Sequence, residues 1–154
     1  MKTGVSLDEA IQISLTEPLS RRTEKVSIEE ARGRITAVPL LSKVDDPRFD
    51  NSAMDGFAVR ESDCEKKGTR LEIVGTSQAG GASPPEIGSG HACRIMTGAP
   101  LPTGADAIVM VEDTEVDGDY VVINGPARAG FIRRKAENLS IGQEALPSGT
   151  LLSA

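Results

Sequence analysis

Two short stretches of the sequence hold polar side chains at spacings that could support chemistry. Residues 50–55 place two carboxylates, an amide and a hydroxyl close together. Such side chains form turns with their own backbone, and carboxylates also bind hydrated hard cations. Residues 94–106 bring Thr97 and Gly98 to the end of an apolar run, where a hydroxyl and close amides suit an anion or a rigid connection. Local chemistry leaves both readings open for each stretch.

Phenylalanine flanks the first stretch on both sides, although the chain has only three Phe, one Tyr and no Trp. Rings at Phe49 and Phe57 that bury at both ends would fix the intervening loop, which favours a site over a plain turn. The remaining core must come from Val, Ile, Leu and Ala. Sixteen Gly and nine Pro divide the chain, a composition typical of many short strands.

Helix signals are confined to the N-terminal part. Residues 6–9 form a capping box, and the apolar spacing behind it predicts a helix that ends at Glu17–Pro18. A second box, residues 27–30, predicts a short helix that stops near Gly33, where a left-handed cap is expected. Residues 34–44 then indicate an extended segment whose proline marks an edge or a bend.

From about residue 45 onward the pattern indicates strands. Short β-branched runs occur at 57–60, 71–75, 93–96, 107–113 and 120–124. Asp117-Gly118 lies between two such runs and predicts a hairpin, because glycine supplies positive φ at the bend. No strand–helix–strand rhythm is found. We therefore expect an antiparallel, partly closed β-module, with a sheet rich in bends continuing to the end.

Composition argues against several function classes. The formal net charge is −6, so we predict no nucleic-acid partner. The first residues lack the apolar core of a signal peptide, and the longest apolar run, residues 107–111, is too short to span a membrane. Cys64 and Cys93 lie far apart without a CxxC motif, which is typical of free thiols in a reducing compartment. These features predict a cytoplasmic protein without membrane contact.

Several catalytic motifs are absent from the sequence. Nothing in GSGHAC orients the single histidine, His91, for nucleophile activation, so we expect a residue at a strand end. There is no P-loop, and one His with two distant Cys gives no structural zinc site. The basic run 133–135 is either a solvated face or a local anion contact. Carboxylate chemistry with a hard metal remains open.

Three blocks of the sequence together resemble one family. They are DPRFDNSAMDGFAVR (46–60), RIMTGAPLPTGADAIVMVED (94–113) and FIRRKAENLSIGQEALPSGT (131–150). Their order and spacing are similar to the N-terminal blocks of the molybdopterin molybdenumtransferases of the MoeA type, also seen in the E domain of gephyrin. The resemblance implies a mainly β fold with short N-terminal helices. A small β-barrel-like module, residues 46–124, is then inserted in an extended α/β linking and dimerisation domain of residues 1–45 and 125–154.

The resemblance also implies an activity. Members of this family take adenylated molybdopterin and molybdate and, with a divalent cation such as Mg²⁺, release AMP and insert molybdenum into the dithiolene. They are cytoplasmic enzymes of molybdenum cofactor biosynthesis and form elongated homodimers. The resemblance admits the molybdopterin adenylyltransferase as a further partner.

Matching motif positions imply roles for individual residues. Asp55 and Thr97 correspond to family residues that line the active cleft. Asp55 would hold the metal or position the activated phosphate, and Thr97 would donate to a phosphate or pterin oxygen. Arg133 would neutralise charge on the nucleotide phosphate or on molybdate. Asn51 and Ser52 belong to the same substrate-binding surface, where they shape the loop rather than react.

The third block departs from the family pattern. Where the family usually has Gly-Glu-Asp, this sequence has Ala136, Glu137 and Asn138. Ala136 replaces a glycine suited to positive φ, and Asn138 replaces a cleft carboxylate, keeping a carbonyl toward substrate without the charge. These changes leave open a second function, a non-catalytic dimerisation or scaffold module of the gephyrin type.

Part of the family architecture is not expected within these 154 residues. Family members continue into a pterin-binding domain and a small C-terminal β-domain, and the final LPSGTLLSA resembles a cut. In the family, the cleft is shared between the β-module of one subunit and the pterin-binding domain of the other. We therefore expect this chain to hold half a site and to be inactive alone.

Overall fold

The computed structural model describes residues 4–16 and 22–153, which belong to two compact units. One unit comprises residues 1–39 and 147–154, and the other comprises residues 40–146. This division follows compactness alone. The organisation implied by the family resemblance, a module of residues 46–124 inserted between 1–45 and 125–154, stays a prediction.

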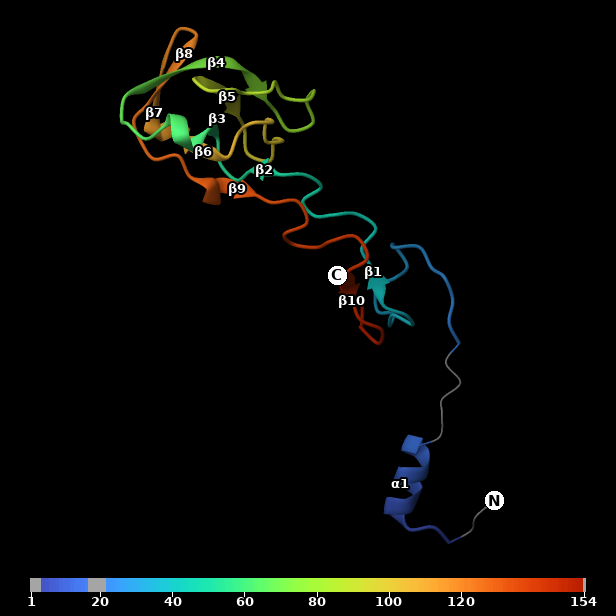
Figure 1. Ribbon diagram of the computed structural model, residues 1–154. Helices are drawn as coiled ribbons and strands as arrows, with labels where there is room; N and C mark the ends of the chain where they lie inside the picture. Colours follow the sequence, from blue (N-terminus) through green and yellow to red (C-terminus); the bar gives the residue numbers. More distant parts are fainter. Residues whose placement is uncertain (1–3, 17–21, 154) are drawn as a thin grey trace. The chain divides into compact units, whose positions relative to one another are not determined.

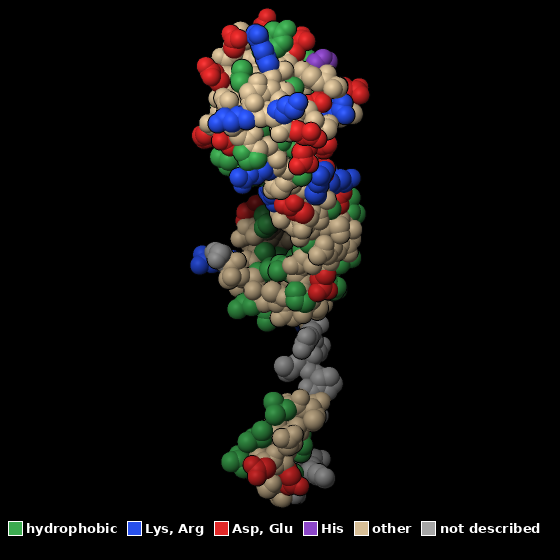
Figure 2. All heavy atoms as spheres, turned by 60° about the vertical axis from the view of Figure 1, so that its left-hand side comes forward, with side chains coloured by type: hydrophobic (Ala, Val, Ile, Leu, Met, Phe, Trp, Pro, Cys, Tyr) green, Lys and Arg blue, Asp and Glu red, His purple; other side chains and the backbone are tan. Residues whose placement is uncertain are grey.

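The first unit contains the one α-helix of the described residues, α1 (Leu7–Thr16). Its capping box forms as predicted: the Ser6 N–H donates to the Glu9 carboxylate at 2.9 Å, and the Glu9 N–H donates to the Ser6 hydroxyl at 3.3 Å. None of its residues is buried, and Figure 2 shows apolar side chains exposed along it. The predicted stop at Glu17–Pro18 lies outside the described residues. Within the described chain, no helix is long and apolar enough to cross a membrane.

The second predicted helix is wrong. From Ser27 onward the chain makes separate turns, with the Glu30 N–H donating to the Ser27 carbonyl at 3.2 Å and the Arg34 N–H to the Ala31 carbonyl at 3.0 Å. Only a few residues separate the expected cap from Gly33, whose φ is +76°. So short a helix does not offset the cost of nucleating its first turn.

A six-stranded sheet dominates the second unit. Its strands are β3 (Gly56–Val59), β4 (Thr69–Ser77), β5 (His91–Ile95), β6 (Ala107–Met110), β7 (Thr114–Asp117) and β8 (Tyr120–Ile123). They lie in the order β6-β3-β5-β4-β8-β7, and the sheet curls into a half-barrel (Figure 1). The mainly β fold is therefore confirmed, and His91 begins a strand as predicted.

Shorter elements accompany this sheet. Two strand pairs are β1 (Leu40–Leu41) with β10 (Glu144–Leu146), and β2 (Asn51–Ser52) with β9 (Ile132–Arg133). The described residues also contain three single 3₁₀ turns, η1 (Glu61–Asp63), η2 (Val111–Asp113) and η3 (Ala129–Phe131). The β2–β9 pair is the element on which the candidate site depends.

One pairing differs from the expected antiparallel module. β4 and β5 run parallel, with Glu72 beside His91, while the other pairings of the described sheet are antiparallel. Parallel neighbours need a crossover of about a dozen residues, and segment 78–90 supplies it without a helix. Because no helical pattern marks this crossover, the sequence indicated only antiparallel neighbours. The hairpin at Asp117-Gly118 is confirmed, and Gly118 has φ +60°.

Apolar side chains pack on both faces of the curled sheet. Alternating strand residues form two clusters, which include Phe57, Val59, Leu71, Val109, Val121 and Ile123 on one face and Ala58, Cys93, Ile95, Ile108 and Ile132 on the other. Phe57 is 1% exposed, whereas Phe49 is 46% exposed. The predicted burial of both rings is therefore wrong for Phe49, and only one end of the loop is anchored by an aromatic side chain.

Candidate functional site

Strand β2 brings the three sequence blocks into contact. On one side Ser52 pairs with Ile132 of β9. On the other side the Ser52 N–H donates to the Ala99 carbonyl at 3.1 Å, and the Gly98 N–H donates to the Ser52 carbonyl at 2.8 Å. Parts of all three blocks therefore lie side by side, held by backbone hydrogen bonds.

Asp55 and Thr97 are in direct contact. Asp55 Oδ1 accepts a hydrogen bond from the Thr97 N–H at 2.7 Å and another from the Thr97 hydroxyl at 2.9 Å. Both hydrogen bonds favour the ionised carboxylate and hold the pKa of Asp55 below its usual range; the Thr97 N–H has the larger effect and the Thr97 hydroxyl the smaller one. Both residues are exposed, and among the described residues no protein group donates to Asp55 Oδ2. This charged oxygen is therefore accessible to a ligand.

The backbone also fixes the position of Asp55. Its carbonyl accepts a hydrogen bond from the Val111 N–H at 3.1 Å. The next residue, Gly56, lies between β5 and β6, and a Cβ there would stand 2.0 Å from the Val109 carbonyl oxygen. Only glycine permits this close approach of β3 to β6, so packing requires Gly56 independently of any chemistry.

Asn51 and Ser52 use their polar groups inside the loop. Asn51 is 7% exposed and Ser52 is 1% exposed. The Ser52 hydroxyl donates to the Met54 carbonyl at 2.5 Å and accepts from the Met54 N–H at 3.1 Å. The Asn51 amide donates to the Phe49 carbonyl at 3.2 Å. These bonds fit a loop-shaping role, and contact of either side chain with substrate stays a prediction.

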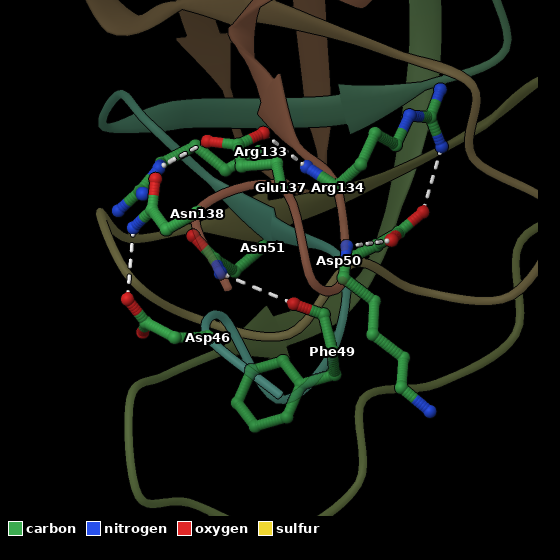
Figure 3. A network of polar contacts seen from close by, with 9 residues as sticks. Asp46, Phe49, Asp50, Asn51, Arg133, Arg134, Glu137 and Asn138 are labelled. Carbon is green, nitrogen blue, oxygen red and sulfur yellow. Dashed lines mark hydrogen bonds and ion pairs between the residues drawn. The ribbon is translucent and has the colours of Figure 1, made fainter. Parts of the chain in front are cut away.

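The Arg133 guanidinium is paired within its own segment. Its Nε donates to Glu137 Oε1 at 2.8 Å, while Glu137 Oε2 accepts from the Arg134 N–H at 2.7 Å (Figure 3). The hydrogen bond from Arg133, which has the largest effect, and the one from the Arg134 N–H hold the pKa of Glu137 below its usual range. The positive charge of Arg133 is therefore already matched by a carboxylate, and its contact with an anionic substrate stays a prediction.

Two further carboxylates, Asp50 and Asp45, bind the basic run, a pairing that the sequence did not predict. Asp50 accepts from the Lys135 N–H at 2.8 Å and from Arg134 Nη1 at 2.7 Å (Figure 3). Asp45 accepts from the Ile141 N–H at 2.9 Å and lies 3.3 Å from Lys135 Nζ. These contacts, led by the backbone amides, hold the pKa values of Asp50 and Asp45 below their usual range. The available signal was complementary charge, since residues 45–50 are rich in Asp and residues 133–135 are all basic.

Both departures from the family pattern have visible structural consequences. Ala136 has φ +64°, the one positive φ of a non-glycine residue in the described chain. Asn138 Nδ2 donates to Asp46 Oδ2 at 2.9 Å, and the Asn138 N–H donates to the Asp46 carbonyl at 2.9 Å (Figure 3). Ala136 thus carries a Cβ where glycine would fit without strain, and Asn138 binds a carboxylate that a second carboxylate would repel.

The donor groups around Asp55 fit a hydrated magnesium ion better than a closed metal centre. In the described part of the chain, no group of three or more His, Cys, Asp or Glu side chains could hold a metal. Mg²⁺ keeps several waters and takes one or two carboxylates together with substrate phosphates. One accessible, ionised oxygen of Asp55 satisfies that modest requirement.

The curled β-module therefore holds an exposed, ionised carboxylate, Asp55, close to the strand where three segments distant in the sequence meet. Comparison with known protein families is specific. Residues 5–154 match the family described as the MoeA N-terminal region (domain I and II). The chain belongs to this family.

Individual relatives agree with this assignment. The molybdopterin molybdenumtransferase of Synechococcus elongatus is 39% identical over 158 residues, covering 97% of this chain and 39% of that protein. The enzyme of the same name from Haemophilus influenzae is 39% identical, covering 97% of this chain and 37% of that protein. A solved structure of the molybdopterin biosynthesis moeA protein from Pyrococcus horikosii has a TM-score of 0.84 at 33% identity. The match covers 97% of this chain and 39% of that one.

These comparisons confirm the expected resemblance in sequence and in fold. They also show that the chain spans less than two-fifths of the length of these relatives.

Proposed function

We propose that the chain is the N-terminal part of an enzyme that inserts molybdate into adenylated molybdopterin and releases AMP. Family membership over residues 5–154 and relatives named molybdopterin molybdenumtransferase support molybdenum cofactor biosynthesis. The observation that carries the proposal for these residues is the Asp55–Thr97 contact, which joins the first two blocks at an ionised carboxylate.

In this proposal Asp55 is the catalytic carboxylate. Its accessible oxygen holds a hydrated Mg²⁺ ion, which when bound supplies positive charge next to the phosphate oxygens of the adenylated substrate. Thr97 keeps Asp55 ionised and oriented, because both of its donors bind the other carboxylate oxygen. The Thr97 hydroxyl donates to a phosphate or pterin oxygen only after rotating away from Asp55.

The remaining proposed residues act at the edge of the site. Arg133 contacts molybdate or the nucleotide phosphate by exchanging its bond to Glu137, a local exchange that costs little at a half-exposed ion pair. Asn51 and Ser52 keep the loop in the shape that presents Asp55. Asn138 offers its carbonyl oxygen to substrate, since its amide group is bonded to Asp46.

The chain is proposed to supply one wall of the site. It spans 39% of the Synechococcus elongatus relative, and the facing wall is assigned to a pterin-binding domain contributed by the other subunit of a homodimer. The molybdopterin adenylyltransferase, which would supply the adenylated substrate, is proposed as a partner, and the reaction is placed in the cytoplasm. The 154-residue chain alone is then inactive.

The test is molybdate-dependent AMP release from adenylated molybdopterin. It compares the 154-residue chain with a chimera in which this chain replaces the matching part of the Synechococcus elongatus enzyme. We expect no turnover from the chain alone and measurable turnover from the chimera, which Asp55→Asn abolishes. Turnover by the chain alone would contradict the shared site, and an active, folded Asp55→Asn chimera would remove Asp55 from catalysis.

A second candidate function, a non-catalytic dimerisation or scaffold module, is favoured by one observation. Asn138 uses its amide to bind Asp46, and position 138 itself carries no carboxylate. Restoring the family residues in the chimera through Ala136→Gly and Asn138→Asp discriminates between the functions. A large gain in AMP release would show that the natural residues impair catalysis, which supports the non-catalytic module. Unchanged turnover would support the enzyme.

A further inference from the structure

Every methionine that the structure describes lies beside the Asp55–Thr97 contact: Met54, Met96 and Met110. Met54 and Met96 directly precede the two residues of the contact. Met110 lies opposite Gly56 in the register between β3 and β6. All three residues are partly buried, so none of them belongs to the fully buried core.

The two cysteines are much poorer targets for oxidation. Burial raises the pKa of the Cys64 thiol to about 11, with smaller contributions from nearby carboxylates such as Asp63. Burial also raises the pKa of Cys93. Because the thiolate is the form that peroxide attacks, both thiols react slowly near neutral pH. A thioether has no proton to lose, so the methionines keep their reactivity.

We propose that these three methionines are sites of reversible oxidation by hydrogen peroxide, and that this modification opens the Asp55–Thr97 contact. One peroxide oxygen is transferred to Sγ, the sulfur is oxidised by two electrons to the sulfoxide, and the peroxide leaves as water. A methionine sulfoxide reductase reverses the step: two electrons from its thiols restore the thioether, and the oxygen leaves as water. The inference does not depend on the reaction proposed above.

Oxidation of Met96 is the step that is proposed to shift the turn holding Thr97. The side chain of Met96 packs against the apolar cluster that contains Ile95 and Ala99. Its carbonyl accepts from the Ala99 N–H at 3.0 Å, which closes the turn that presents Thr97. A sulfoxide oxygen has no favourable place against apolar side chains, so the turn must shift to solvate it.

The test treats the 154-residue chain with hydrogen peroxide and follows it by peptide mass spectrometry and amide hydrogen exchange. We expect the peptides of Met54, Met96 and Met110 to gain one oxygen each before either cysteine is modified. The Thr97 amide then exchanges faster than in the untreated chain, and methionine sulfoxide reductase restores slow exchange. Oxidation of the cysteines first, or unchanged Thr97 exchange after complete methionine oxidation, would overturn the proposal.

The matched control is Met96→Leu, which nearly conserves side-chain volume and removes the sulfur. We expect this variant to keep slow exchange at Thr97 both before and after peroxide. Rapid exchange after peroxide in a folded variant would show that Met96 is not the residue that moves the turn. Should the variant not fold, the reductase reversal in the unaltered chain still decides the proposal.

Discussion

The Asp55 carboxylate accepts both donors of Thr97, a residue 42 positions further along the chain, through one oxygen. The hydrogen bond from the Thr97 N–H, at 2.7 Å, depends on the turn that follows β5. The hydrogen bond from the Thr97 hydroxyl, at 2.9 Å, depends on the threonine side chain. Substitution at position 97 therefore separates the two contributions.

Thr97→Val removes the hydrogen bond from the hydroxyl to Asp55, and it keeps the hydrogen bond from the backbone N–H and the shape of the side chain. Because a donor to the ionised form is lost, we expect the pKa of Asp55 to rise toward its ordinary value. Thr97→Ser, which keeps the hydroxyl, serves as the control and leaves the pKa low. Carbon-13 NMR titration of the Asp55 carboxyl measures both, and equal values in the two variants would show that the hydroxyl does not contribute.

Acid weakens the contact between the first and third blocks. The pKa of Asp50 is depressed in the folded chain by the Lys135 amide and by Arg134. Its stabilising contribution is therefore present above the unfolded pKa, near 4, and is lost as pH falls through the folded value. Urea unfolding followed from about pH 6 to about pH 3 should show this loss. Asp50→Asn should flatten it, and an unchanged slope would contradict the assignment.

Ala136→Gly should stabilise the chain. Ala136 has φ +64°, and a non-glycine residue in this region costs about 1 kcal/mol relative to its ordinary conformations. We expect a gain of about that size in the free energy of unfolding, measured by urea titration. Ala145→Gly in β10 is the control, and it should destabilise by about 0.5–1 kcal/mol because glycine loses more backbone entropy there. A loss of stability at position 136 would contradict the predicted strain.

Gly56→Ala should destabilise the sheet at the position of Asp55. The added Cβ would stand 2.0 Å from the Val109 carbonyl oxygen, so β3 and β6 must separate. We expect a loss of about 3 kcal/mol in the free energy of unfolding, together with faster exchange of the Val111 amide. Gly130→Ala is the matched control, since nothing lies within 4 Å of a Cβ there. Equal stability of the two variants would show that the sheet accommodates the methyl group.

The strands could be predicted from the sequence because their signal is local. Alternating β-branched runs indicated β3, β4, β5, β6 and β8, and Asp-Gly indicated the β7–β8 hairpin. The wrong helix after Ser27 had correct caps but too few residues between them. The parallel β4–β5 pair has no local signal, since its crossover contains no helix.

The site residues could be predicted by motif, but their contacts could not. Asp55 and Thr97 lie in separate loops, and their hydrogen bonds follow from the strand pairing on either side of them. The contacts of Asp45 and Asp50 with the basic run could not be predicted either, because they also join segments that are far apart in the sequence. The exposure of Phe49 could not be predicted, because the position of an aromatic residue beside a turn does not show whether its ring faces the core or solvent.

Strand β2 also decides where the chain can change in length. Ser52 is paired on both sides, and three residues later the chain must present Asp55 to Thr97. One inserted residue here would turn the following side chains to the opposite face. Residues 78–83 are all exposed, and loop closure entropy grows only slowly with length. Insertions, tags and fused domains are therefore expected to be tolerated at 78–83 and rejected at 50–56.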